Sequence, residues 1–181
     1  MSTLVSGRCQ PHEISADYHR GLIEATPGSD VLAVLQEQRA WLQQVASAVS
    51  PDQVDQVHAP YGWTIRQVLA HCADAERVFG YRMLRYAAGD PTELPGWDEN
   101  FYADSRFGLG NFEHLVSELD QLRQTNLLLL QRIEPACWDR SGVAEGKRLS
   151  VRALAWLTAG HLRHHLLIVQ KRLGQGAVGS D

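Results

Sequence analysis

Apolar residues recur every three or four positions in four long segments of the chain, and this spacing predicts amphipathic helices. The segments run from about residue 30 to 49, 64 to 88, 111 to 133 and 150 to 173. A proline or a glycine follows each of them, as expected where helices end, and no segment shows a convincing strand period. Four helices of about 20 residues predict an all-α protein with the architecture of a four-helix bundle.

Local signals place the starts of three of these helices. Thr64 and Gln67 have the spacing of a capping box, in which each side chain satisfies a backbone N–H group of the other residue. Asn111 is a candidate N-cap for the third helix, and the fourth starts at Ser150. In the third helix we expect an apolar face made of Phe112, Leu115, Leu119, Leu122, Leu129 and Ile133.

The segments between the predicted helices differ in length. A long crossover, about 89–110, joins the second and third helices, and it is rich in Gly, Pro and Asp. Because long loops are often functional, its three aromatic residues favour a packed, functional segment. We expect residues 1–28 to be an irregular lead-in with a short helix at about 18–25, residues 29–173 to form the bundle, and residues 174–181 to be a flexible tail.

Composition places the chain among compact soluble proteins. It has 181 residues, of which 44% are hydrophobic and 21% are charged, and these values are typical of one globular domain. The net charge is −4, with acidic and basic residues interleaved, which argues against a nucleic-acid partner because such proteins need a basic face. No apolar stretch approaches the 18 residues of a membrane span.

The cysteines and the N-terminus favour a cytoplasmic protein. Cys9, Cys72 and Cys137 form no C-x-x-C pair, and an odd number of cysteines suits a reducing compartment. We expect each of them to be a small buried hydrophobic residue. The first ten residues have neither the basic start nor the apolar run of a secretory signal.

Histidines on two predicted helices carry the strongest chemical signal. His161 and His165 are four residues apart, so they lie about 40° apart on one helix face and can reach one ion. His71, on the second predicted helix, would supply a third ligand. Three neutral imidazoles hold a divalent metal ion and leave coordination positions open, as catalytic sites do. Spacing does not distinguish His165 from His164, since residues three apart also share a face.

Burial decides between a metal site and ordinary core histidines. All three histidines lie on or beside apolar stripes, and burying an imidazole without a partner costs about 1–3 kcal/mol. A lone core histidine is usually satisfied by a local hydrogen bond, whereas three that face inward favour metal coordination. We expect the other histidines to be solvated: His12, His19, His58 and His114.

Residues near the histidines have two interpretations each. Asp74 and Glu76 are candidates to accept a hydrogen bond from a ligand imidazole and orient it; the alternative is that they are solvated helix charges, and this alternative is stronger for Glu76. Trp63 and Trp97 would wall the pocket, or pack in the core or against the loop. No separate general base is evident in the sequence.

Three stretches of the sequence resemble the DinB-like (YfiT-like) family of metal-dependent enzymes. They are G-W-T-I-R-Q-V-L-A-H-C-A-D-A-E around His71, R-Y-A-A-G-D-P-T-E-L-P-G-W-D after it, and G-H-L-R-H-H-L in the last helix. The resemblance covers about residues 10–173. It implies a four-helix bundle that binds a divalent ion, often zinc or nickel, through one histidine of the second helix and an H-x-x-x-H pair of the fourth. These histidines correspond to His71, His161 and His165, with His164 as a neighbour.

Two classes of function follow from this site. A metal held by three imidazoles can lower the pKa of a bound water to about 7 or hold a thiol as thiolate. The resemblance implies a thiol S-transferase that uses bacillithiol, mycothiol or glutathione, or else a hydrolase, acting on a small electrophile. One alternative is a non-catalytic metal-binding or stress-associated bundle, for which a homodimer is possible. Another is a structural bundle without metal.

Overall fold

The computed structural model describes residues 5–105 and 110–174 of the chain. The predicted lead-in, crossover and tail therefore extend in part to residues 1–4, 106–109 and 175–181, which lie outside the described residues.

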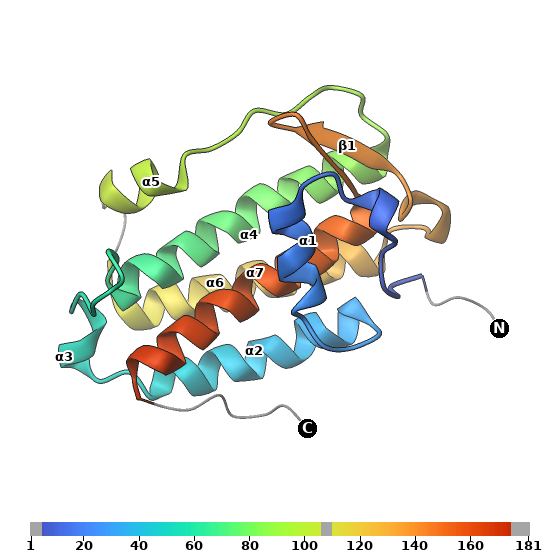
Figure 1. Cartoon of the computed structure of the whole chain (residues 1–181). Coiled ribbons are helices and arrows are strands. Elements are labelled where there is room, and N and C mark those ends of the chain that lie inside the picture. The colour runs from blue at the N-terminus through green and yellow to red at the C-terminus, as the bar shows by residue number, and fades with distance from the viewer. Residues whose placement is uncertain (1–4, 106–109, 175–181) are drawn as a thin grey trace.

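Four long helices form a bundle, which confirms the predicted fold class (Figure 1). They are α2 (Val31–Ser47), α4 (Ile65–Ala88), α6 (Phe112–Gln131) and α7 (Val151–Arg172). Both α2 and α4 pack against α6 and against α7, so α2 and α4 lie diagonally opposite each other. Consequently α4 and α7 are direct neighbours, although about 60 residues separate them in the chain.

The predicted caps are present and set where the helices begin. The Gln67 backbone N–H donates to Thr64 Oγ1 at 3.1 Å, and the Thr64 N–H donates to Gln67 Oε1 at 3.0 Å. Asn111 Oδ1 accepts from the His114 N–H, and Ser150 Oγ accepts from the Ala153 N–H. These bonds satisfy donors that an uncapped helix leaves free, and they fix the starts of α4, α6 and α7.

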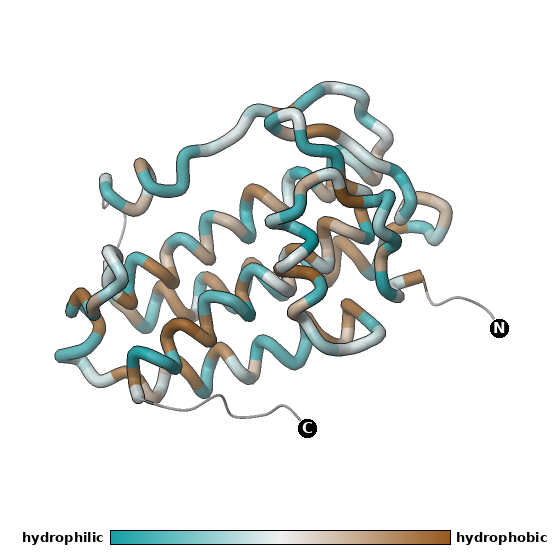
Figure 2. The backbone as a smooth tube through the Cα atoms, viewed as in Figure 1, coloured by the Kyte–Doolittle hydropathy of each residue, from teal (hydrophilic) through white to brown (hydrophobic). Residues whose placement is uncertain are grey.

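Polar and apolar residues alternate along the four helices, as the hydropathy colouring in Figure 2 shows. No helix in the described part of the chain is both long enough and apolar enough to cross a membrane. Of the expected apolar face of α6, Leu115 and Leu119 are buried and the other four residues are half-buried against the core, whereas Leu127 and Leu130, which the expectation left out, are buried. The reason is that α6 also turns two polar residues, Arg123 and Asn126, toward the interior.

A two-stranded antiparallel hairpin precedes α7, and the sequence did not predict it. Strand β1 (Ser141–Ala144) pairs with β2 (Lys147–Ser150). The two residues of the turn, Glu145 and Gly146, have φ values of 53° and 68°, as in the tight turns that join twisted strands. The hairpin lies at one end of the bundle, near the end of α4 (Figure 1).

Shorter elements cover the bundle and complete the site. They are η1 (Pro11–Glu13), α1 (Asp17–Glu24), α3 (Pro51–Val54), α5 (Glu99–Ser105) and η2 (Pro135–Cys137). Helix α1 confirms the short helix expected in the lead-in, and α5 lies within the long crossover and packs on α4. A Cβ at Gly160 of α7 would lie 2.6 Å from Leu22 O, so glycine there lets α1 lie directly on α7.

Candidate metal site

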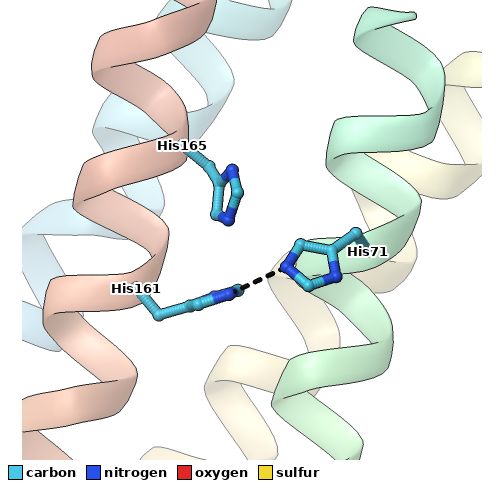
Figure 3. Close-up of side chains that lie close together, drawn as sticks. All are labelled: His71, His161 and His165. Carbon is cyan, nitrogen blue, oxygen red and sulfur yellow. Dashed lines mark hydrogen bonds between the residues drawn. The ribbon is translucent and has the colours of Figure 1, made fainter. Parts of the chain in front are cut away.

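The structure brings His71, His161 and His165 together between α4 and α7 (Figure 3). One ring nitrogen from each lies within 4.8 Å of the other two. The closest pair is His71 Nε2 and His161 Nε2, which are 2.9 Å apart. His71 follows two turns after the Thr64 cap, and the other two residues are one turn apart on α7.

Burial keeps these imidazoles neutral. His71 is 7% exposed, and desolvation lowers its pKa from 6.5 to about 4. The pKa values of His161 and His165 are also lowered, first by desolvation and then by the neighbouring imidazoles. At neutral pH each ring therefore offers an unprotonated nitrogen, the form that binds a metal ion.

Hydrogen bonding does not account for this group of histidines. His71 Nδ1 and His165 Nδ1 are shielded from solvent and have no hydrogen-bond partner among the described residues. Buried polar atoms normally have partners, but His19 Nδ1 and His58 Nδ1 are in the same state, so what sets this group apart is the convergence of three ring nitrogens. Three neutral imidazoles within reach of one point fit the donor set of a zinc-type ion, in which ligand nitrogens lie roughly 3 Å apart.

Asp74 and His164, two residues near the candidate ligands in the sequence, lie outside the group of three histidines. Asp74 Oδ1 lies 3.9 Å from Arg77 Nη1 on the outer side of α4, and no hydrogen bond joins Asp74 to His71 among those found in the described residues. His164 is exposed, and its ring meets the His165 ring edge-on at 5.1 Å. It is not a member of the close group of three.

Glu76 is neither solvated nor in contact with the histidines, so both interpretations of this residue are wrong. Its side chain is 3% exposed and forms an ion pair with Arg123, which is 1% exposed. Arg123 also donates to Gln38 Oε1 and to Thr158 O, and Asn126 Nδ2 donates to Glu76 Oε2 at 2.7 Å. We call Glu76, Arg123, Gln38 and Asn126 the ion-pair cluster. The cluster forms only where α2, α4, α6 and α7 pack together, and no local sequence pattern indicates such a contact between distant segments.

Aromatic side chains wall the histidines, which agrees with the first of the two interpretations of Trp63 and Trp97. The Trp97 ring stacks on the His71 ring, with the ring centroids 5.5 Å apart and an angle of 9° between the planes. The centroid of the Trp63 ring lies 5.2 Å from that of His71. Phe79 meets His161 edge-on. The histidines open into a cavity of about 270 Å³, just below the usual range for drug-sized ligands. The walls therefore suit a small molecule.

One histidine expected to be solvated lines this cavity instead. His19 is half-buried because α1 packs on α7 and turns this residue toward the cavity. His58 is half-buried as well, whereas His12 and His114 are exposed as predicted. The sequence placed His19 in a short helix, but it held no signal for the docking of that helix on α7.

The cysteines lie outside the group of ligand atoms. All three are free thiols; Cys72 is buried, as expected, but Cys9 and Cys137 are only half-buried. Burial raises the pKa of the Cys72 thiol far above its usual value, so Cys72 remains protonated and packs as a small apolar residue.

A helical bundle that gathers three imidazoles within reach of one ion, on the wall of a cavity, defines a class of candidate metal-binding proteins. The sequence matches the family model of the DinB superfamily over residues 24–169. The chain belongs to the DinB superfamily.

Two solved structures show a similar fold. YfiT from Bacillus subtilis, described as a probable metal-dependent hydrolase with an unusual four-helix bundle topology, superposes with a TM-score of 0.71 at 21% identity. The match covers 95% of this chain and 99% of YfiT. The mycothiol-dependent maleylpyruvate isomerase superposes with a TM-score of 0.64 at 15% identity, and the match covers 83% of this chain and 61% of the isomerase chain. Comparison with curated proteins gave no significant match.

Proposed function

We propose that this chain is a metal-dependent enzyme that acts on a small electrophile, with His71, His161 and His165 as ligands of a divalent ion, zinc or nickel. The observation that carries the proposal is the close group of three neutral imidazoles that line a cavity. A site that served only the stability of the fold would have no need for a cavity next to the ion. A non-catalytic metal-binding bundle is therefore the second candidate.

The residues around the ligands have roles that follow from their positions. Trp97 and Trp63 cover His71, and Phe79 covers His161, so these rings limit the access of water to the site. Low hydration strengthens the electrostatic interactions of a charged ligand. Stacking against Trp97 also holds the His71 ring in one orientation, which substitutes for the hydrogen bond that usually orients a ligand imidazole.

An ion in this site supplies Lewis acidity, which activates either a thiol or a water molecule. Of these two reactions we propose thiol S-transfer first, because it needs no dedicated general base. Among the described residues, the close group of possible metal ligands consists of the three histidines, and no hydrogen bond joins them to a carboxylate. The isomerase of similar fold is mycothiol-dependent and YfiT is described as a probable hydrolase, so a thiol requirement and hydrolysis are both ascribed to proteins of similar fold.

The test compares consumption of one reporter electrophile with and without a cellular thiol. A thiol transferase should consume a haloarene or an epoxide only in the metal-loaded form and only when bacillithiol, mycothiol or glutathione is present. A hydrolase should cleave an ester or an amide with no thiol added. The His161→Ala variant is the blank for both assays.

If neither reaction exceeds that blank over several thiols, esters and metals, the enzyme proposal fails. The non-catalytic bundle would then be the better account, provided that the protein binds the ion.

A further inference from the structure

The cavity has a second polar region, far from the three histidines. Arg82 lines the same cavity and lies eleven residues after His71 on α4. Eleven residues correspond to about 16 Å along the helix and to positions within about 20° of the same face. The hairpin residues Glu145 and Lys147 also line the cavity. The cavity therefore extends along α4 from the histidines toward the hairpin.

The Arg82 guanidinium is enclosed but has few partners. Its side chain is 11% exposed. Among the described residues it donates one hydrogen bond, from Nη2 to Pro95 O at 3.2 Å, and the nearest carboxylate oxygen, Glu145 Oε1, is 3.8 Å away. A guanidinium has five N–H donors, so most of those of Arg82 have no protein acceptor among the described residues. Arg82 can thus still bind an anionic group.

The acidic residues of the cavity do not satisfy Arg82. Glu145 already accepts from the Trp97 backbone N–H at 3.1 Å and from Lys147 Nζ at 3.0 Å, and its distance to Arg82 is longer than a hydrogen bond. Glu99, the other cavity carboxylate, is exposed at the start of α5. Two cations, Arg82 and Lys147, thus lie beside one carboxylate, Glu145, at this end of the cavity.

The imidazole of His19 also lines this region of the cavity. Its Nδ1 is shielded from solvent and has no hydrogen-bond partner among the described residues. The pKa of His19 is lowered by burial and, next, by the charges of Lys147 and Arg82. The imidazole is therefore neutral at neutral pH, and it lies within the field of both cations.

We propose that Arg82 and His19 bind a carboxylate group of the small molecule whose reacting end lies at the three histidines. A guanidinium matches a carboxylate with two parallel hydrogen bonds, which an ammonium group does not provide. This inference rests on the proposed function, because it assumes that the histidines hold the reacting end. It defines the substrate class as elongated carboxylates.

The middle of the cavity fits an apolar segment of that molecule. Phe79, which lies between His71 and Arg82 on α4, and Leu157, which precedes His161 on α7, line the cavity there. Both side chains are buried. Apolar contacts there stabilise a hydrocarbon chain and do not discriminate between its end groups. Discrimination for a carboxylate therefore depends on Arg82 and His19.

The first experiment tests the carboxylate site without relying on the metal. The full-length protein, both as purified and after treatment with a chelator, is titrated with hexanoate and with hexanamide and followed by NMR. We expect hexanoate to bind about ten-fold more tightly than hexanamide, the size of a charge-assisted hydrogen bond. Arg82→Met should abolish this preference and Arg82→Lys should reduce it.

The matched control is Arg77→Met. Arg77 lies on the same helix but pairs with Glu118 outside the cavity, so its loss should leave the preference unchanged. Circular dichroism checks the fold of each variant, and Arg82→Lys decides the matter if Arg82→Met does not fold. Equal binding of hexanoate and hexanamide to the wild-type protein overturns the proposal. So does an undiminished preference for hexanoate in the Arg82→Lys variant.

A second experiment tests whether one molecule reaches both ends. The protein loaded with cobalt is titrated with 6-mercaptohexanoate and with 6-mercaptohexanol, and thiolate binding is followed by its absorption band. We expect the acid to bind about ten-fold more tightly, and only when Arg82 is present. Equal affinities would show that Arg82 does not act on the molecule bound at the histidines. If cobalt does not bind, the proposed function fails, while the hexanoate titration still decides whether Arg82 binds carboxylates.

Discussion

Two polar groups lie in the interior of this bundle, and their hydrogen bonding differs. In the ion-pair cluster, the carboxylate of Glu76 and the guanidinium of Arg123 are joined to each other and to Asn126, Gln38 and a backbone carbonyl. The three histidines have only each other: His71 and His161 share one short contact, and two Nδ1 atoms have no partner among the described residues.

This difference separates a structural role from a binding role. A buried charge pair with most of its donors and acceptors filled has no capacity left for a ligand, and it acts on the packing of the helices around it. Neutral imidazoles whose ring nitrogens converge on one point have that capacity. We therefore expect changes in the ion-pair cluster to alter stability and changes in the histidines to alter ligand binding.

The largest expected effect is the loss of metal on replacing a ligand. His71→Ala, His161→Ala and His165→Ala should each lower metal affinity on the order of a thousand-fold, since a ligand contributes about a quarter of the binding energy of a four-coordinate ion. Competition with a chromophoric chelator measures the affinity. His164→Ala is the matched control and should keep most of it; the ligand assignment fails if His164→Ala empties the site and His165→Ala does not.

The next effect concerns the stability of the fold. Glu76→Ala should lower the free energy of unfolding by about 3–5 kcal/mol, because it leaves the Arg123 charge buried without its partner. The double variant Glu76→Leu with Arg123→Met should cost less, since neither charge remains. Urea unfolding measures both. Stability equal to wild type in Glu76→Ala would contradict the structural role of the pair.

A smaller effect is the dependence of stability on pH in the metal-free protein. The folded pKa of His71 is about 4, below its unfolded value of 6.5, so between these values the unfolded chain binds more protons. The contribution of His71 to the free energy of unfolding should be fully present above about pH 6.5. It should fall by about 3 kcal/mol as the pH drops toward 4. Thermal melts over this range give the slope.

The variant His71→Leu provides the comparison for that measurement. It lacks the proton acceptor, so its melting temperature should change less between pH 6.5 and 4 than that of wild type. Parallel curves for the two proteins would show that His71 is not buried in its neutral form.

The smallest predicted effect comes from the wall of the site. Trp97→Ala removes the ring that stacks on His71 and should weaken metal binding by about ten-fold, the lower end of what residues that orient a ligand contribute. Trp97→Phe keeps a stacking surface and should lose less. The same chelator competition applies, and an unchanged affinity in Trp97→Ala would mean that stacking does not orient the imidazole.

What the sequence could predict is what short segments determine. The capping box of Thr64 and Gln67 lies within one helical turn, and the spacing of His161 and His165 places them on one face whatever the rest of the chain does. The apolar stripe of α4 was enough to indicate that His71 faces inward. The four helices and the proposed ligands were therefore visible in the sequence.

The features that were missed depend on contacts between distant segments. Arg123 reads as a surface residue until α6 is set against α2 and α4, and His19 reads as solvated until α1 lies on α7. Strands β1 and β2 have only four residues each, too few to show a period, and their Glu145-Gly146 turn lacks the usual asparagine or aspartate.

Elemental analysis of the purified full-length protein tests the central claim most directly. The account predicts about one zinc or nickel ion per chain in the wild-type protein and almost none in His161→Ala, with both proteins folded. A wild-type protein that holds no stoichiometric divalent ion, even after incubation with zinc and with nickel at neutral pH, would contradict it.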